Sequence, residues 1–319
     1  MKKWLLCLGL ALSVSAGATS NIKEILVNAG LTMPIKDIRS SMIEGLWQVH
    51  LDEAEPLFIS QDGRYVLQGT PEPNPSPKVA ISSSLITSTD KAGKPVSDEY
   101  HQALLANMTS LKNLNADTAF FYTNIKDLLW GVSGVGGVPF LVSGDGRYFI
   151  NGEISVIENG QFAGLDTDFE WTKNRHVLSS LDEKTLTIYP ANPQKAVIYV
   201  ATDTQCPYCR LFHKQISRLN AQGITVKVIG YPVYDEAHEP MRQIWCEADN
   251  TKRAKLLSLA MTGVHPKNTC QTQTNALTKN QKMAQALALI ATPAIYRADG
   301  VLFEGDFQNG ELLAFLGVR

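Results

Sequence analysis

Ala196-Val197-Ile198-Tyr199-Val200 precedes Thr202-Asp203-Thr204-Gln205-Cys206-Pro207-Tyr208-Cys209 in the last third of this chain of 319 residues. The first stretch is continuously apolar, which is typical of a strand buried on both faces of a sheet. The second ends in two cysteines separated by two residues, after polar residues that can cap a helix starting there. Apolar residues then recur at helical spacing as far as Gly223, a residue that fits a helix stop.

The segment that follows completes a recognisable order of elements. Residues 224–229 predict another strand, and helical patterns follow at 239–248, 252–261 and 274–289. A short strand after Pro293, a turn at Asp299-Gly300 and a closing helix at 310–316 end the chain. Strand, helix, strand, helices, hairpin and helix is the order of a thioredoxin-like domain with a helical insertion.

The position of the cysteines predicts their chemistry. The thiolate is the attacking species in disulfide exchange, and the free N–H groups at a helix N-terminus stabilise that anion. We therefore expect Cys206 to be the exposed nucleophile and Cys209, one turn later, to be the buried resolving thiol. Pro207 suits the first helical turn. His213 lies on the same helix face as Cys209, where it is either an ordinary helix residue or one that biases the thiols.

The N-terminus predicts export. Met1-Lys2-Lys3, an apolar run and Ala16-Gly17-Ala18 match a signal peptide spanning residues 1–18. Its removal takes Cys7 and leaves Cys206, Cys209, Cys246 and Cys270 of the five cysteines in the chain, an even number in an oxidising compartment.

Cys246 and Cys270 predict a structural disulfide. A second redox pair and a zinc site shared with Cys206 and Cys209 are the alternatives. Structural zinc sites usually use two close pairs, whereas Cys246 and Cys270 are 24 residues apart. We therefore expect no metal and no organic cofactor. The formal charge of −2, with no basic stripe, argues against nucleic acid as a partner.

The first half of the chain contains a repeat at an offset of 83 residues. Leu46-Trp47-Gln48-Val49 aligns with Leu129-Trp130-Gly131-Val132, and Ser60-Gln61-Asp62-Gly63-Arg64-Tyr65 aligns with Ser143-Gly144-Asp145-Gly146-Arg147-Tyr148. Asp-Gly between two apolar runs indicates a hairpin. Each copy therefore predicts a small, strand-rich unit preceded by a helix, and four prolines between positions 71 and 77 predict a stiff spacer between the copies.

At this point the chain resembles the DsbC/DsbG family of periplasmic disulfide isomerases. The resemblance rests on residues 171–319, including Thr202 to Cys209, Ile244-Trp245-Cys246, the later Cys270 and Ala291-Thr292-Pro293-Ala294. The inner dipeptide Pro207-Tyr208 is similar to that of DsbG. The resemblance implies that Thr292 and Pro293 face the two cysteines, with Pro293 either cis, as in thioredoxin-like folds, or a trans proline at a strand start.

The resemblance also implies an α+β and α/β multidomain fold. Both repeat copies are similar to the cystatin-like N-terminal dimerisation unit of the family, which has one such unit per chain. The predicted parts are a signal peptide (1–18), a first unit (19–70), a Pro/Ser-rich linker (71–97), a second unit (98–168), a linker helix (169–190) and a thioredoxin-like domain (191–319).

The implied function is that of a periplasmic thiol:disulfide oxidoreductase. It would isomerise or reduce wrong disulfides in misoxidised exported proteins, bind them as a chaperone does and be kept reduced by a membrane donor of the DsbD type. The alternatives are a DsbG-like reductase of sulfenic acids, a DsbA-like oxidase and a mainly non-enzymatic chaperone or assembly module. The doubled unit leaves two oligomeric states open, a homodimer and an internally paired monomer.

Overall fold

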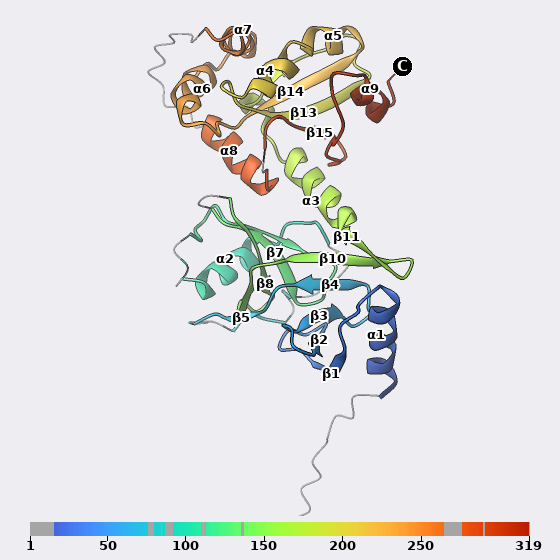
Figure 1. Ribbon diagram of the computed structural model, residues 1–319. Coiled ribbons are helices and arrows are strands. Elements are labelled where there is room, and N and C mark those ends of the chain that lie inside the picture. Colours follow the sequence, from blue (N-terminus) through green and yellow to red (C-terminus); the bar gives the residue numbers. More distant parts are fainter. Residues whose placement is uncertain are drawn as a thin grey trace, which may run out of the picture. The chain divides into compact units, whose positions relative to one another are not determined.

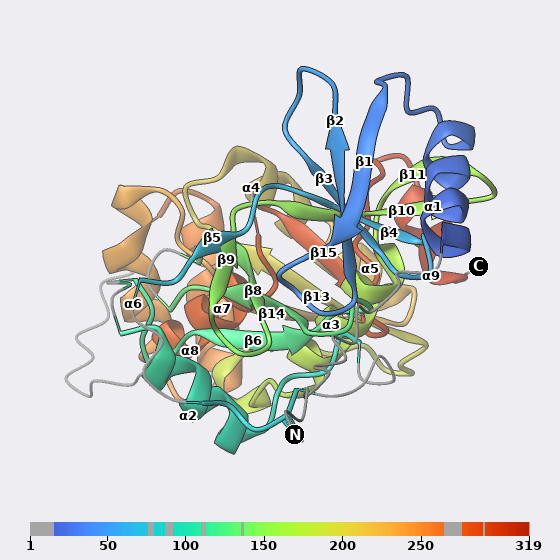
Figure 2. The same ribbon diagram turned by 90° about the horizontal axis from the view of Figure 1, so that it is seen from below.

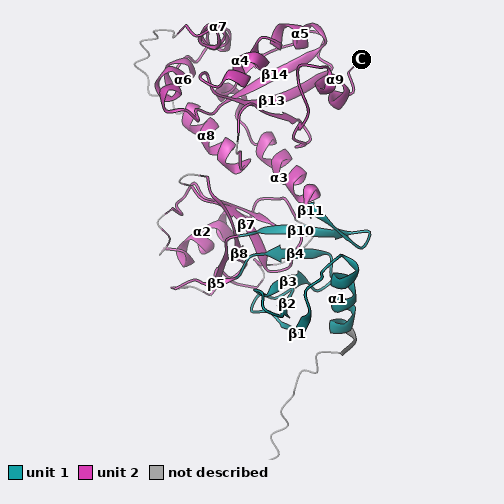
Figure 3. Cartoon of the chain, viewed as in Figure 1, with its two compact units in different colours: residues 1–70, 152–165 teal, residues 71–151, 166–319 magenta. Residues whose placement is uncertain are grey.

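The structure, a computed structural model, forms two compact units (Figure 3). Unit 1 comprises Met1–Thr70 with Gly152–Leu165, and unit 2 comprises Pro71–Asn151 with Asp166–Arg319. The structure describes residues 16–75, 80–83, 85–86, 92–109, 111, 113–134, 137–264, 276–289 and 291–318. The predicted signal peptide lies almost wholly outside these residues.

The described residues of unit 1 form one antiparallel sheet and one helix. The helix α1 (Ala16–Asn28) lies alongside this sheet in both views (Figures 1 and 2), because its buried Ile22 and Leu26 pack against Val49, Ile59 and Val66. The sheet order is β1-β2-β3-β4-β10-β11. Its strands are β1 (Ile35–Ser40), β2 (Leu46–Leu51), β3 (Leu57–Ser60), β4 (Tyr65–Gln68), β10 (Glu153–Glu158) and β11 (Gln161–Leu165).

The second repeat copy belongs to a five-stranded antiparallel sheet within unit 2, in the order β5-β9-β8-β7-β6. The helix α2 (Asp98–Asn107) packs on it through buried Tyr100 and Leu104. Ser97 caps this helix by accepting a hydrogen bond from the Tyr100 N–H. The strands are β5 (Glu72–Pro73), β6 (Ala119–Tyr122), β7 (Leu128–Val132), β8 (Pro139–Ser143) and β9 (Tyr148–Ile150).

The two predicted Asp-Gly hairpins are confirmed, and their turns have the same hydrogen bonds. In the first, the Ser60 hydroxyl bonds to Asp62 and accepts from the Tyr65 N–H at 2.9 Å. In the second, the Ser143 hydroxyl donates to Asp145 at 2.6 Å and accepts from the Tyr148 N–H at 3.0 Å. The repeat in the sequence is therefore also a repeat in local structure.

Each sheet contains a strand that follows the other repeat copy along the chain. β10, which follows the second copy, pairs with β4 of the first, and β5, which follows the first copy, pairs with β9 of the second. The registers Ser155↔Val66 and Glu72↔Phe149 are related by the offset of 83 residues. The compact units therefore do not follow the predicted boundaries: residues 72–73 of the predicted spacer are a strand, and residues 153–165 belong to the sheet of unit 1.

The C-terminal part of unit 2 has the predicted thioredoxin-like order of elements. Its sheet order is β12-β14-β13-β15, with β13 and β14 parallel and the other pairs antiparallel. The strands are β12 (Thr187–Tyr189), β13 (Ala196–Thr202), β14 (Ile224–Gly230) and β15 (Ala294–Arg297). The helices are α4 (Pro207–His213), α5 (Ile216–Ala221), α6 (His238–Trp245), α7 (Asn250–Met261), α8 (Ala276–Ala286) and α9 (Glu311–Leu316) (Figure 1).

Two helices differ from their predictions. The helix expected after Cys206 is divided into α4 and α5. The linker helix α3 (Thr167–Ser179) begins where the Asp166 carboxylate accepts the Phe169 N–H at 3.1 Å, and it ends before the short 3₁₀ helix η2 (Glu183–Thr185). The cap at Asp166 therefore fixes where α3 begins, and the separate helix η2 follows where α3 ends. Within the described residues, no helix has the length and hydropathy needed to span a bilayer.

Candidate active site

The two cysteines lie where the central strand β13 passes into α4. Cys206 is the N-cap residue of this helix, and Pro207 occupies its first turn. The Cys206 N–H donates to the Asp203 carbonyl at 3.3 Å, which fixes the turn between strand and helix. Tyr208 is 62% exposed and lies between the two thiols in the sequence. The predicted placement of the motif at a helix start is therefore what the structure shows.

The two thiols are free and differ in their surroundings. Cys209 is fully buried, and its backbone N–H donates to the Cys206 sulfur at 3.4 Å. The Cys206 sulfur lies 3.2 Å from the Thr292 carbonyl oxygen, to which the thiol donates when it is protonated. Cys206 is only 4% exposed, less than expected for the nucleophile, because its sulfur faces Thr292 rather than solvent.

These surroundings separate the acidities of the thiols. The hydrogen bond from the Cys209 side chain lowers the pKa of Cys206 to about 6, with further contributions from Thr292 and the backbone of Cys209 and Tyr208. Burial raises the pKa of Cys209, and the hydrogen bond to Cys206 adds to that shift. At neutral pH one sulfur is therefore a thiolate while the other stays protonated, as a nucleophile and a resolving thiol require.

Thr292 and Pro293 come from a segment far along the chain, just before β15. The peptide bond between them is cis. β15 pairs with β13, the strand that leads to Cys206, and this pairing brings Thr292 to the sulfur. The structure thus brings together four of the residues singled out in the sequence, Cys206, Cys209, Tyr208 and Thr292.

Asp203 has a larger role than the sequence suggested. The sequence indicated only that the turn before Cys206 could cap a helix. In the structure Asp203 is fully buried, and its carboxylate accepts from the N–H groups of Gln205 at 2.6 Å, Val233 at 2.6 Å and Tyr234 at 2.9 Å. No local pattern could have revealed the contacts to Val233 and Tyr234, because they join segments 30 residues apart.

Arg210 also holds this turn from the first turns of α4. Its Nε donates to the Thr204 carbonyl at 2.8 Å, and its Nη2 donates to the Gln205 side-chain oxygen at 3.1 Å. The turn that presents Cys206 is therefore fixed from two directions, by the carboxylate of Asp203 and by the guanidinium of Arg210.

His213 does not face the thiols. Its Nε2 lies 3.0 Å from the Ser258 hydroxyl on α7, and its ring meets the Tyr189 ring edge-on. Burial lowers the pKa of His213 to about 4, so this ring is neutral at physiological pH. It therefore supports the packing of α4 on its neighbours rather than the chemistry of the cysteines.

The remaining cysteine prediction is only partly within the described residues. Cys246 is disulfide-bonded, whereas Cys270, its predicted partner, lies outside them. Among the described side chains, no group of three or more His, Cys, Asp or Glu residues has the arrangement of a metal site.

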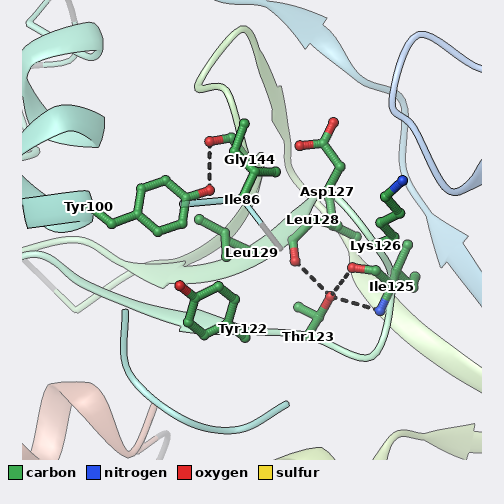
Figure 4. A pocket seen from close by; sticks show the side chains of 10 residues that line it. All are labelled: Ile86, Tyr100, Tyr122, Thr123, Ile125, Lys126, Asp127, Leu128, Leu129 and Gly144. Carbon is green, nitrogen blue, oxygen red and sulfur yellow. Dashed lines mark hydrogen bonds between the residues drawn. The ribbon is translucent and has the colours of Figure 1, made fainter. Parts of the chain in front are cut away.

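The small cavity in unit 2 is a separate feature (Figure 4). Tyr100, Tyr122 and Asp127 are among the residues that line it, and the Tyr100 hydroxyl donates to the Gly144 carbonyl at 2.7 Å. Its volume of about 10 Å³ is no more than one water molecule needs. This cavity therefore has no room for a substrate.

Two family models match the chain. Residues 183–317 match a thioredoxin-like domain, and residues 13–71 match a disulfide bond isomerase protein N-terminal domain. The thiol:disulfide interchange protein DsbC of Dickeya dadantii is 31% identical over 192 residues, which cover 58% of this chain and 78% of the relative. The chain belongs to the DsbC family. It is thus a thiol:disulfide oxidoreductase with a thioredoxin-like domain and a DsbC N-terminal domain.

Another curated relative and a solved structure also match the chain. DsbC of Pasteurella multocida is 30% identical over 194 residues, covering 58% of this chain and 82% of the relative. A disulfide interchange protein from Neisseria gonorrhoeae has a solved structure with a TM-score of 0.36 and 17% identity, covering 44% of this chain and 100% of that one. Residues 72–182, which include the second repeat copy, lie between the two segments that match family models.

Proposed function

We propose that the protein isomerises or reduces non-native disulfides in exported proteins of the periplasm. The observation that carries this proposal is the difference between the two thiols. Cys206 has its pKa lowered to about 6, whereas burial raises the pKa of Cys209. A thiolate next to a protonated partner can attack a substrate disulfide and then resolve the mixed disulfide, and membership of the DsbC family favours isomerisation or reduction over oxidation.

The proposed reaction begins with the Cys206 thiolate attacking one sulfur of a substrate disulfide. A bond forms between Cys206 and that sulfur, the substrate disulfide breaks, and the second substrate cysteine leaves as a thiolate. If a substrate thiolate then attacks the mixed disulfide, Cys206 leaves as a thiolate and the substrate disulfide is isomerised. If Cys209 attacks instead after losing its proton, the substrate leaves reduced and Cys206 and Cys209 become a disulfide.

The two outcomes can be separated with single variants acting on scrambled ribonuclease A. Cys206→Ala should abolish refolding, since no attacking thiolate remains. Cys209→Ala should keep most of the isomerisation but lose net reduction, because only Cys209 can release a reduced substrate within the enzyme. A Cys206→Ala variant that refolds the substrate as well as the unaltered protein would disprove the enzymatic proposal.

Reduced thiols require a source of electrons. The resemblance to the family suggests a membrane reductant of the DsbD type, which would return the Cys206–Cys209 disulfide to two thiols. Trapping the redox state in cells tests this point and the DsbA-like alternative together. We expect mostly free thiols in normal cells and mostly disulfide when the donor is removed. A mostly oxidised pair in normal cells would favour the oxidase.

Two alternatives remain beside isomerisation. A DsbG-like enzyme would reduce sulfenic acids on single cysteines, and it would do so without any substrate disulfide. A chaperone or assembly module would suppress aggregation of a cysteine-free protein, with or without Cys206. Assays on a protein sulfenic acid and on a cysteine-free aggregating protein distinguish these activities from disulfide exchange.

We propose an internally paired monomer, built on two cystatin-like units, as the working form. The strand exchange supports this proposal: β10 pairs with β4 and β5 with β9, in registers related by the 83-residue repeat. A homodimer of a one-copy protein would need a second chain to supply such strands. Here a single chain supplies both β5 and β10.

Light scattering on the purified protein tests the oligomeric state. The proposal predicts the mass of one chain, at most 35.0 kDa, at all concentrations tested. A stable mass of two chains would refute it and would place the repeat in a longer dimer.

A further inference from the structure

A second segment runs beside the active-site turn. The Tyr231 N–H donates to the Thr202 carbonyl at 2.9 Å, and the N–H groups of Val233 and Tyr234 donate to the Asp203 carboxylate. Thr202 and Asp203 immediately precede the turn to Cys206. Three hydrogen bonds therefore hold the segment from Tyr231 to Tyr234 against the two residues that precede the turn to Cys206.

The Asp203 carboxylate joins the two segments from within the protein. It is fully buried, and one oxygen accepts from Gln205 while the other accepts from both Val233 and Tyr234. A buried carboxylate is costly unless hydrogen bonds replace its hydration, and backbone N–H groups are suitable donors. The position of residues 233–234 is thus coupled to the position of the turn that presents Cys206.

The side chains held in this way are apolar and exposed. Val233 is 52% exposed and Tyr234 46% exposed, and Tyr208, next to the nucleophile, is 62% exposed. Single exposed apolar residues are ordinary on protein surfaces. What distinguishes Val233 and Tyr234 is that a buried carboxylate fixes their backbone while their side chains remain in solvent. Because the backbone of these two residues is already ordered, binding a partner here costs less conformational entropy than binding to a flexible loop.

We propose that Val233 and Tyr234 bind the apolar stretch of substrate polypeptide that flanks the attacked disulfide, and that Asp203 is the positioning residue that aligns them with Cys206. This inference rests on the proposed function. Misoxidised polypeptides expose apolar segments that a folded protein would bury, and such a segment lies next to the sulfur while Cys206 attacks. A small disulfide has no such segment, so its reaction depends on Cys206 alone.

The first test compares two substrates of the full-length reduced protein. One is scrambled ribonuclease A, and the other is a dipyridyl disulfide without a polypeptide. The measured quantity is the ratio of kcat/KM for scrambled ribonuclease A to the rate constant for the dipyridyl disulfide. The double variant Val233→Ser with Tyr234→Ser should lower this ratio by about tenfold, mainly because KM for ribonuclease A rises. A ratio within twofold of the unaltered protein would overturn the proposal.

A matched control is available on α7. Leu259 is 43% exposed, comparable to Tyr234, and it lies on a different element of the same domain. Leu259→Ser should leave the ratio unchanged. An equal fall in this control would show that general surface hydrophobicity, rather than Val233 and Tyr234, governs binding, and it would also overturn the proposal.

The second test addresses Asp203. Asp203→Ala should lower the same ratio, because Val233 and Tyr234 lose their anchor, whereas a merely structural defect would reduce both reactions equally. Asp203→Asn retains one oxygen that accepts hydrogen bonds and should restore part of the ratio. Equal losses for both substrates in a folded Asp203→Ala protein would rule out the positioning role. If Asp203→Ala does not fold, the result for the double variant Val233→Ser with Tyr234→Ser decides whether these side chains bind substrate.

Failure of the proposed function gives a different result. In that case the unaltered protein would react with the dipyridyl disulfide but would not refold scrambled ribonuclease A. If the unaltered protein refolds the substrate and the ratio stays constant in the double variant, the isomerase proposal stands and the docking proposal is refuted.

Discussion

The sulfur of Cys206 lies 3.2 Å from the carbonyl oxygen of Thr292, a residue 86 positions further along the chain. The pairing of β15 with β13 makes this contact possible, since it brings the residues before β15 to the end of the central strand. The same placement brings the Thr292 side chain to Cys206, and its hydrogen bond helps lower the pKa of the thiol, so the acidity of the nucleophile depends on a segment outside its own helix.

The reactivity of Cys206 should depend on pH with a midpoint of about 6, the pKa that its hydrogen bonds give it. Only the thiolate reacts, so the rate of alkylation by iodoacetamide should rise through this midpoint and level off above pH 7. Absorbance at 240 nm, which reports the thiolate directly, should follow the same curve. A midpoint above 8 would contradict the proposed environment of the sulfur.

The same shift predicts how the stability of the reduced protein changes with pH. The pKa of Cys206 is lower in the folded state than its ordinary value of 9.0. The thiolate therefore contributes its full stabilisation above pH 9 and loses it as the pH falls towards 6. Between these limits the free energy of unfolding should rise by up to about 1.4 kcal/mol per pH unit relative to Cys206→Ser.

Thr292→Val should raise the pKa of Cys206. A side-chain hydrogen bond from Thr292 is among the interactions that lower this pKa, and valine has nearly the same shape without the hydroxyl. The alkylation curve should move to higher pH. Thr187→Val, which alters a fully buried threonine on β12, is the control and should leave the curve in place. If the alkylation curve of Thr292→Val does not move, the other hydrogen bonds to Cys206 account for its lowered pKa.

Lys173 of α3 should be replaceable by methionine but not by alanine. Its fully buried amine pairs with Glu170 at 2.7 Å and lies 4.0 Å from the centre of the Trp130 ring, and burial lowers its pKa. Lys173→Met keeps the volume and leaves Glu170 partly in solvent, so it should cost less than about 1 kcal/mol. Lys173→Ala should cost about 2–4 kcal/mol because it opens a cavity.

Denaturant unfolding measures both lysine variants. The surface pair of Lys282 and Asp117 supplies a control, since both side chains are about 40% exposed or more. Lys282→Ala should change the free energy of unfolding by less than about 1 kcal/mol. A methionine variant less stable than the alanine variant would show that the charge of Lys173, and not its volume, supports the fold.

Gly152→Ala should disrupt the pairing of β4 with β10. A Cβ atom at this position would lie 1.7 Å from the carbonyl oxygen of Gln68, closer than any real contact. We expect a loss of more than about 2 kcal/mol in the free energy of unfolding. Gly160→Asn is the control, because its Cβ would meet open space and asparagine tolerates positive φ. Equal stability of the two variants would contradict the strand exchange as a source of stability.

The sequence predicted the thioredoxin-like part well because its information is local. The apolar run of β13 and the cysteines at the start of α4 lie within about 14 residues, and each indicates its own structure. The repeated Asp-Gly turns were predictable for the same reason. In each turn the glycine, Gly63 or Gly146, has positive φ, and apolar runs lie on both sides of the turn.

The features missed are those that join distant segments. Nothing in the sequence around β10 indicates that it pairs with β4 rather than with the strand just before it. The hydrogen bonds from Val233 and Tyr234 to Asp203 likewise depend on the packing of β14 beside β13. Such contacts depend on tertiary geometry, and a single sequence carries no local pattern for them.

The exchange of strands also has a consequence for how the chain is made. Gln68 pairs with Glu153, which leaves the ribosome about 85 residues later, so the first sheet lacks its neighbour for β4 while the second copy is synthesised. Until then the edge of β4 is open, and an open edge invites pairing with other chains. Contacts of such long sequence separation also form slowly. The duplication lets one chain supply strands to both sheets, but it ties the completion of the first sheet to the synthesis of the second copy.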